Sequence, residues 1–545
     1  MSAPHTARRA SNAANNDEEQ LQDSTQVTTP LLSHLSVPEM NQASIEYDPT
    51  QQQRPLLPFS SSATIADLES EADPLNVETI KGEAIGLVKS ALPIVVSTMS
   101  QLLIMIPMMA AVGRFGTIAL ASMNLVSIYA GLGGIAPLSG MAMALDSLCS
   151  QAFTAAKNKR LLGIYLQRVL LLFVFLEAAI YPIWWNATTI YKLIGIPDEV
   201  AETTGRILRL YFFGIALLFT YECLKSYLFA QGIRRFAVLS QAICLPVGWL
   251  SIWLLLVNES TSIGILGVPC VITIVSICFN IFALVFIARF DGYQCWSGWS
   301  RSAFTHLMPI LKLGLAGSAI SFVESLSLHM IDLGVLFLDA PTMAAQAILS
   351  VILTGTWVMG TGTAIAACNR VGHLLGASMA NRARLVVYIT LGISLSTFVA
   401  LSSVLIVNRY SLADIFTKDS EVATILSAHV PWAAVSGAIQ GVNMSLSGIL
   451  RGQGRQLLIA RIRTVSFISF AVPISAVTVA VFHWGLSGLW FGYLVSLVIN
   501  LCAQLYFIST TQWSLEIERC HSRVNNAMLA ASLEDNPEEE DEDII

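Results

Sequence analysis

Twelve apolar stretches, each long enough to cross a lipid bilayer, dominate this sequence. They cover residues 87–112, 117–143, 164–186, 208–230, 236–257, 262–288, 308–337, 342–367, 383–407, 425–450, 459–482 and 487–509. Because a membrane-spanning helix needs about 20 apolar residues, they predict an all-α integral membrane protein with twelve transmembrane helices. The composition agrees, since 12% of the 545 residues are charged, whereas soluble proteins have about 25%.

The two ends of the chain are polar. Residues 1–80 are rich in Ser, Thr, Gln, Asn and Pro and lack the order of a secretory signal peptide, so we expect a disordered tail. Residues 514–545 form a second tail, in which the run from Glu538 to Asp543 is strongly acidic. Acidic tails argue against a nucleic-acid partner.

The distribution of basic residues indicates how the chain crosses the membrane. An even number of crossings puts both tails on one side. The loops and adjoining helix turns on that side contain fifteen Lys and Arg residues, whereas the opposite side contains six. By the positive-inside rule, both termini are cytoplasmic. Two glycosylation sequons, at Asn186 and Asn258, fall in predicted outside loops, which agrees with this orientation.

The chain also contains an internal repeat. Phe229–Gly232 ends the fourth stretch, and the similar segment Arg451–Gly454 ends the tenth, 222 residues later. Two further pairs of short motifs recur at spacings of 222 and 221 residues. Six crossings per repeat predict two lobes of the same orientation, residues 81–300 and 301–513, with a cavity between them.

The seventh stretch contains a carboxylate, Glu324. A charged carboxylate at the centre of a bilayer costs at least ~2.5 kcal/mol, so it should face protein or a water-filled cavity. A polar stripe lies beside it at helical spacing: Ser318, Ser321, Ser325, His329 and Asp332. We expect this face to line the cavity and Glu324 to bind and release a proton there. The alternative is a carboxyl group that hydrogen-bonds across helices and only holds the bundle together.

Other acidic residues lie within apolar stretches. Glu177 is near the middle of the third stretch and has no basic neighbour in the chain, so it is a second candidate proton site. Glu222 precedes Lys225 by three residues, which predicts an ion pair. Asp332 has two interpretations: it shares a proton with Glu324 and His329, or it is a solvated residue at the outer end of its helix.

Short motifs recur in order along residues 85–515. In the first half they are Phe115–Ala121, Ala144–Phe153 and Leu162–Arg168, and in the second half they are Ala345–Gln346, Asn369–Ala377, Phe416–Asp419 and Ser447–Gly454, followed by Gly485–Gly492 and Trp513. Together these motifs resemble the multidrug and toxic compound extrusion (MATE) family, in its eukaryotic and fungal branch.

The resemblance implies two six-helix lobes in a V that open alternately to each side and export organic, often cationic, compounds against proton entry. It gives Glu324 the coupling role, because this residue stands where eukaryotic members begin a Glu-Trp-Trp-x-x-Glu pattern. The chain departs from that pattern, since His329 replaces the second acid and both tryptophans are absent. Gln440 occupies a position where family members carry an acid.

The same resemblance draws attention to the inner ends of the second and eighth helices. We expect the polar residues there to form a cytoplasmic gate or to cap the helices; with a motif glycine, they are Asp146, Gln151, Asn369, Arg370 and Gly372. Arg451 belongs to the Arg-Gly pair that ends the tenth helix.

Two other functions stay open beside the exporter: a lipid or oligosaccharide flippase of the same wider superfamily, and an uncoupled channel or sensor. A flippase predicts a cationic cavity, and the stretches hold few internal cations beyond Lys225 and Lys312. No catalytic triad, phosphate-binding loop or metal-ligand spacing occurs, so we expect neither an enzyme nor a metal or other cofactor. The expected partners are small organic solutes, protons (with sodium as the alternative ion) and the lipid bilayer. We expect a monomer in the vacuolar or plasma membrane.

Overall fold

The structure, a computed structural model, describes residues 77–417 and 419–535. These residues form helices and connecting turns without a β-strand. Twelve of their helical segments are long and apolar enough to cross a membrane. The predicted fold class is therefore confirmed. The sequence predicted a disordered tail over residues 1–80. Residues 1–76 lie outside the described part of the chain, whereas residues 77–80 belong to the first turn of a helix, so the prediction was wrong for them.

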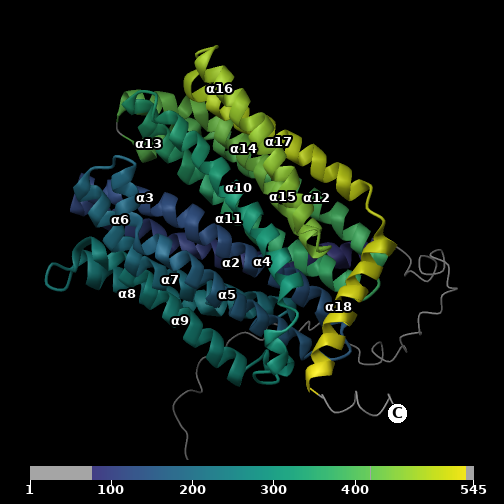
Figure 1. Cartoon of the computed structure of the whole chain (residues 1–545). Helices are drawn as coiled ribbons and strands as arrows, with labels where there is room; N and C mark the ends of the chain where they lie inside the picture. The colour runs from purple at the N-terminus through teal and green to yellow at the C-terminus, as the bar shows by residue number, and fades with distance from the viewer. Residues whose placement is uncertain (1–76, 418, 536–545) are drawn as a thin grey trace, which may run out of the picture. The chain divides into compact units, whose positions relative to one another are not determined.

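The first six spanning segments run from Val77 to Arg289 (Figure 1). They are α2 (Val77–Val112) with the 3-10 turn η2 (Gly113–Phe115); α3 (Thr117–Ala130) and α4 (Ala136–Ala155), joined by the π turn η3 (Gly131–Ile135); α5 (Leu161–Trp185); α7 (Asp198–Ala230); α8 (Arg235–Ile252) with the π turn η4 (Trp253–Val257); and η5 (Gly264–Leu266) with α9 (Gly267–Arg289). The short helix α6 (Ala187–Leu193) connects α5 to α7.

The second six segments follow two 3-10 turns, η6 (Tyr293–Cys295) and η7 (Arg301–Phe304). They are α10 (Leu307–Val335); α11 (Ala340–Gly376); α12 (Ala380–Val407); α14 (Ser420–Gly452); α15 (Gln456–Ser466) and α16 (Val472–Ala480), joined by the π turn η8 (Phe467–Ala471); and α17 (Gly485–Ser509). The short helix α13 (Arg409–Phe416) precedes α14, and α18 (Trp513–Asp535) follows α17.

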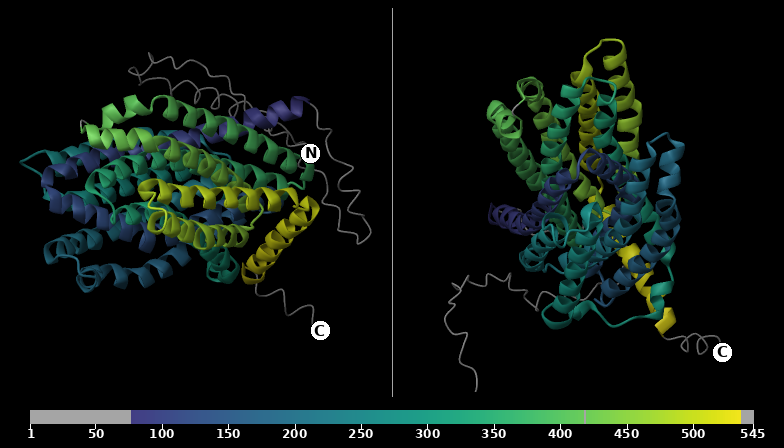
Figure 2. Two further views of the ribbon diagram at one scale, coloured as in Figure 1. Left: turned by 90° about the horizontal axis from the view of Figure 1, so that it is seen from above. Right: turned by 90° about the vertical axis from the view of Figure 1, so that its left-hand side faces the viewer.

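Some helices extend beyond the apolar stretches. The helix α2 begins at Val77, whereas its apolar stretch begins at residue 87. A larger difference is α18, because the sequence predicted only an acidic tail from residue 514 onward. The acids gather after residue 533, and the preceding segment carries side chains such as Cys520 and Val524 that are buried against the bundle. Figures 1 and 2 show α18 turning away from α17.

The apolar cores divide largely by halves of the chain. The largest cluster is built mainly from α2 to α9, and it includes the stacked rings of Tyr221 and Phe279. Two further clusters belong to α10–α17, one around Ile449 and one around Trp490. We call α2–α9 the first half and α10–α17 the second half; the lobe boundary at residues 300 and 301 stays a prediction.

The two halves approach most closely where α4 crosses α10. A Cβ atom added to Gly140 would lie 1.9 Å from the backbone nitrogen of Ser318, and one added to Gly317 would lie 2.5 Å from the carbonyl oxygen of Gly140. Only glycine allows backbones to pack at this distance. The contact brings α10, which carries Glu324, directly against the first half.

Candidate functional site

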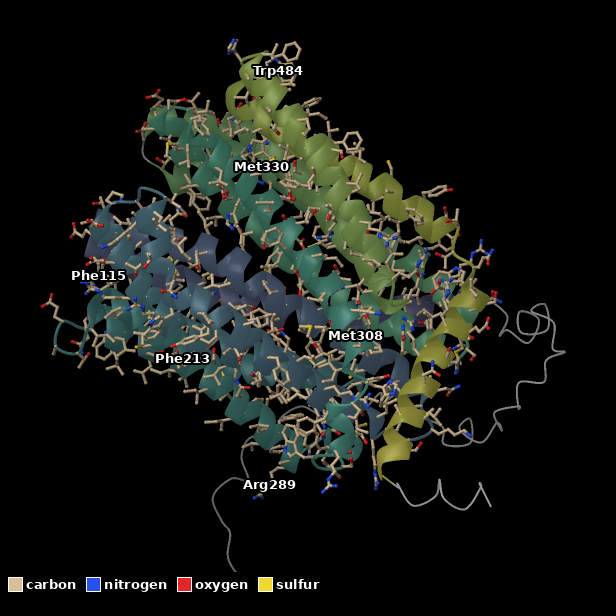
Figure 3. All side chains as sticks on the ribbon, in the orientation of Figure 1. Phe115, Phe213, Arg289, Met308, Met330 and Trp484 are labelled. Atoms are coloured by element: carbon tan, nitrogen blue, oxygen red, sulfur yellow. The ribbon has the colours of Figure 1, made fainter. Side chains whose placement is uncertain are left out.

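Glu324 lies in the interior of α10, in the part of the helix between Met308 and Met330 (Figure 3). Its side chain is 6% exposed. The carboxylate forms an ion pair with Arg463 of α15, in which Oε2 lies 2.7 Å from Nη1. The arginine side chain is buried as well. A carboxylate inside a spanning helix thus has its counter-charge within the protein.

Two neutral side chains donate hydrogen bonds to the other carboxylate oxygen. The Nε1 atom of Trp357 in α11 and the Nε2 atom of Gln440 in α14 each lie 2.9 Å from Oε1. On the arginine, Nη2 donates to Ser447 Oγ at 3.2 Å. Three helices besides α10 therefore fix the position of the carboxylate, and the glutamine at the acid position of the family pattern is one of the donors.

A cavity of about 30 Å³ lies beside this ion pair. Besides Glu324 and Arg463, its polar lining includes Tyr493, Ser496 and Asn500 of α17. This volume suits one or two water molecules, whereas sites for drug-sized ligands measure about 300 Å³ or more. The arrangement can hold a proton and water next to the carboxylate, but it is too small for a bulky solute.

Arg463 shows that one sequence-based argument was wrong. The spanning segments contain more internal cations than expected, because Arg168, Arg451 and Arg463 are buried in α5, α14 and α15. Each lies near the end of its segment that the sequence assigns to the cytoplasm, so it was counted among the flanking basic residues. Helical periodicity could have separated them, since Arg463 shares a face with the buried residues Gln456 and Ile459.

The predicted polar stripe of α10 lies mainly against the first half. Ser318 Oγ donates to the carbonyl oxygen of Pro137 at 2.7 Å, and Ser139 Oγ donates to Ser321 Oγ at 2.8 Å. Ser325 is partly buried. None of these three serines lines the small cavity next to Glu324. The stripe and the carboxylate therefore occupy different faces of α10.

His329 and Asp332 belong to a separate polar network. His329 Nδ1 lies 3.6 Å from Asp332 Oδ2. Asp332 Oδ1 accepts hydrogen bonds from Gln346 Nε2 at 3.0 Å and Ser350 Oγ at 2.7 Å. Since eight residues of helix rise about 12 Å, Asp332 lies well above Glu324 along α10. Within residues 77–417 and 419–535, no hydrogen bond joins this network to the carboxylate of Glu324.

The two remaining intramembrane acids differ in their partners. Lys225 Nζ lies 2.6 Å from Glu222 Oε1, which confirms the predicted ion pair. Glu177 in α5 is partly buried and makes no hydrogen bond or ion pair with any other residue in 77–417 or 419–535. Glu177 therefore stays a second candidate proton site.

The predicted gate residues lie where α4 meets α11 and α14. Gln151 Nε2 donates to the carbonyl oxygen of Gly452 at 2.7 Å, and Ser147 Oγ donates to that of Arg451 at 2.6 Å. A Cβ atom on Gly372 would lie 2.1 Å from Ser150 Oγ, so this position has no room for a larger residue. These contacts join the first and second halves at the helix ends that the sequence assigns to the cytoplasm.

Sequence reasoning missed one partner at this place. Glu83 of α2 is 7% exposed and forms an ion pair with Arg370 of α11, with Nε 2.8 Å from Oε2. Asp146 and Asn369 are buried nearby in the sequence-predicted gate, and the Oδ1 atom of each has no hydrogen-bond partner among the described residues. Glu83 precedes the first apolar stretch at residues 87–112, so the sequence did not mark it as an acid within a spanning helix.

The two sequon asparagines lie at helix ends. Asn186 follows α5, is exposed and donates from Nδ2 to the carbonyl oxygen of Pro182 at 2.8 Å. Asn258 follows η4 and is partly buried. Both asparagines therefore lie at ends of spanning helices, as the sequence predicted. Their glycosylation stays a prediction.

Twelve helices long enough to span a membrane, with a buried and paired carboxylate among the described residues, are typical of a multi-pass membrane transporter. The MatE family model matches residues 93–254 and 318–477. The chain therefore belongs to this family, whose members are transporters. Membership supports a role in the efflux of compounds. The two matched ranges fall in the two halves of the repeat.

Similar proteins agree with this assignment. An uncharacterized transporter of Schizosaccharomyces pombe is 28% identical over 82% of this chain and 84% of its own length. The protein DETOXIFICATION 17 of Arabidopsis thaliana is 28% identical over 76% of this chain and 87% of its own length. The crystal structure of the eukaryotic MATE transporter AtDTX14 superposes with a TM-score of 0.77 at 20% identity, covering 82% of this chain and all of that one. The resemblance stated from the motifs is confirmed.

Proposed function

We propose that this protein is a proton-coupled antiporter that exports organic, often cationic, compounds by alternating access between its two halves. The observation that carries the proposal is the carboxylate of Glu324, buried in a spanning helix and shared by four helices of the second half. Ionisable residues at this depth are costly and are usually retained for function. Membership of an efflux family supports the direction of transport.

Proton binding at Glu324 would weaken its interactions with Arg463, Trp357 and Gln440. The neutral carboxyl group no longer compensates the charge of Arg463, and an uncompensated charge in the interior is strongly unfavourable. Arg463 lies on α15 directly before the π turn η8, where the regular helix is already interrupted. A rearrangement of α15 relative to α10 would therefore follow protonation, and this rearrangement couples the proton to a second conformation.

The proton and the organic solute occupy different places in this proposal. The cavity beside Glu324 measures about 30 Å³, which admits water only. We place the solute between the two halves, in a space that forms when the close contact of α10 with α4 opens during the transport cycle. We further propose that the protein is a monomer in the vacuolar or plasma membrane and that both of its termini lie in the cytoplasm.

The test is uptake of a fluorescent organic cation into proteoliposomes under an imposed pH gradient. Wild type should accumulate the dye only with the gradient, and Glu324→Gln should reduce accumulation to the level of protein-free liposomes. Glu177→Gln is the matched control and should retain uptake. Loss of uptake in Glu177→Gln alone would move the proton site to α5. Dye flux that ignores both a proton and a sodium gradient would instead mean an uncoupled channel.

A further inference from the structure

A groove of about 490 Å³ lies where the cytoplasmic ends of α12 and α17 meet the start of α18. It is separate from the ion pair of Glu324 and from the gate residues. One end of the groove is polar and the other is apolar. This division decides what kind of molecule can occupy it.

The polar end carries one cation. Arg384 of α12 is exposed, and it makes no hydrogen bond or ion pair with another residue in the described ranges 77–417 and 419–535. Asn381, Thr511, Gln512 and Ser514 surround the same end, and the described lining contains no Asp or Glu. A guanidinium group with free donors and no competing carboxylate suits a phosphate group.

The apolar end continues into the spanning helices. Its lining there consists of Val387 and Leu391 of α12 and Leu505 and Ile508 of α17. Leu391 follows Arg384 by seven residues, or about two helical turns, so the floor extends about 10 Å toward the membrane interior. The aromatic side chain of Tyr388, which is 60% exposed, lies between the two ends, as aromatic residues do at membrane interfaces.

We infer that this groove binds an anionic phospholipid, with the phosphate-containing headgroup at Arg384 and an acyl chain along the apolar floor. A free anion would use only the polar end, whereas a lipid uses both. The groove opens at the helix ends that carry the basic loops, and the cytoplasmic leaflet is the one that holds anionic lipids. This lipid site does not depend on whether Glu324 couples transport to protons.

The experiment uses the purified full chain in detergent, titrated with dioleoyl phosphatidylserine or dioleoyl phosphatidylcholine, with bound lipids counted by native mass spectrometry. Wild type should bind phosphatidylserine at least about fivefold more tightly than phosphatidylcholine, which is the contribution of one basic residue near an anionic surface. Arg384→Gln should abolish this preference, because it weakens the binding of phosphatidylserine more than that of phosphatidylcholine, which carries the same phosphate but no net negative charge.

The matched control is Arg289→Gln. Arg289 is also exposed and ends α9 in the first half (Figure 3), so its loss changes the net charge by the same amount away from the groove. A second variant, Ser514→Glu, adds a negative charge to the polar end in the first turn of α18, where an acid suits the helix. It should also abolish the preference. Melting curves confirm that each variant is folded.

Three results would overturn the inference. The first is an equal loss of phosphatidylserine binding in Arg384→Gln and Arg289→Gln, which would mean a general charge effect. The second is displacement of the lipid by inorganic phosphate at an equal concentration, since this would leave no role for the apolar floor. The third is no lipid preference in the full chain, which would follow if an acidic segment of the protein itself occupied the groove.

Discussion

Glu324 and Arg463 compensate each other's charge inside the second half. Neither side chain is more than 6% exposed, and the two approach to 2.7 Å. The attraction in such a pair offsets the cost of removing both charges from water, so the pair as a whole adds little to stability. Removal of one partner is different, because the remaining charge keeps its desolvation cost and loses its compensation.

We therefore predict that Arg463→Gln lowers the stability of the protein by about 3–5 kcal/mol. The double variant Glu324→Gln with Arg463→Gln should recover most of this loss, because no buried charge remains. Thermal unfolding in detergent at neutral pH measures the difference. Arg461→Gln, an exposed position on the same helix, is the control and should behave as wild type. A double variant as unstable as Arg463→Gln would show that the arginine acts through packing and not through charge.

These two residues also show what the sequence could predict of the site. Glu324 was identified because a carboxylate in a long apolar stretch is conspicuous. Its arginine was not, because Arg463 lies in the second turn of α15, beside a loop that is basic throughout. The two residues are far apart in the sequence and meet only in the folded structure. A single sequence gives no information on such a pair.

At the scale of the element, hydropathy predicted where the spanning helices lie. It did not predict how the helices pack against one another. All twelve spanning segments were expected, because apolar residues must fill the thickness of the bilayer. The helix α18 was missed because its mixed composition lacks the long apolar run of a spanning segment. It packs against α4 and α5 of the first half and against α11 and α12 of the second half, and Arg523 Nη2 donates to the carbonyl oxygen of Gln453 at 2.8 Å.

The attachment of α18 should depend on pH through His521. This residue forms a hydrogen bond between Nε2 and Ser378 Oγ at 3.0 Å, and burial lowers the pKa of its imidazole below the ordinary value of 6.5. A detached helix therefore binds the proton more readily than a packed one, so packing weakens as the pH falls below about 6.5.

Hydrogen exchange of the α18 amides tests this expectation. The amides of Trp513–Asp535 should exchange faster at pH 5.5 than at pH 7.5, after correction for the intrinsic rate. His521→Gln keeps a polar side chain that does not titrate, so it should remove most of the difference between the two pH values. An equal pH dependence in wild type and His521→Gln would exclude the histidine as the cause.

At the scale of the whole described structure, the two halves are joined at the gate by buried contacts. They include the ion pair of Glu83 with Arg370, the hydrogen bond of Gln151 to Gly452, and the packing of α18 on both halves. In the proposed alternating access, all of them would separate when the side that the sequence assigns to the cytoplasm opens. The ion pair is the contact whose removal disturbs packing least, because Arg370 is partly exposed and can be hydrated.

Loss of this ion pair should therefore shift the equilibrium toward the conformation that is open at the gate. Cys368 reports the shift, because it is fully buried and its Sγ atom lies 3.9 Å from Ser147 Oγ of the other half. A charge-assisted hydrogen bond contributes about 1.5 kcal/mol or more, so Glu83→Gln should speed alkylation of Cys368 by a water-soluble maleimide roughly tenfold. Glu78→Gln, an exposed position on the same helix, should leave the rate unchanged. Equal rates in wild type and Glu83→Gln would mean that the ion pair does not hold the gate closed.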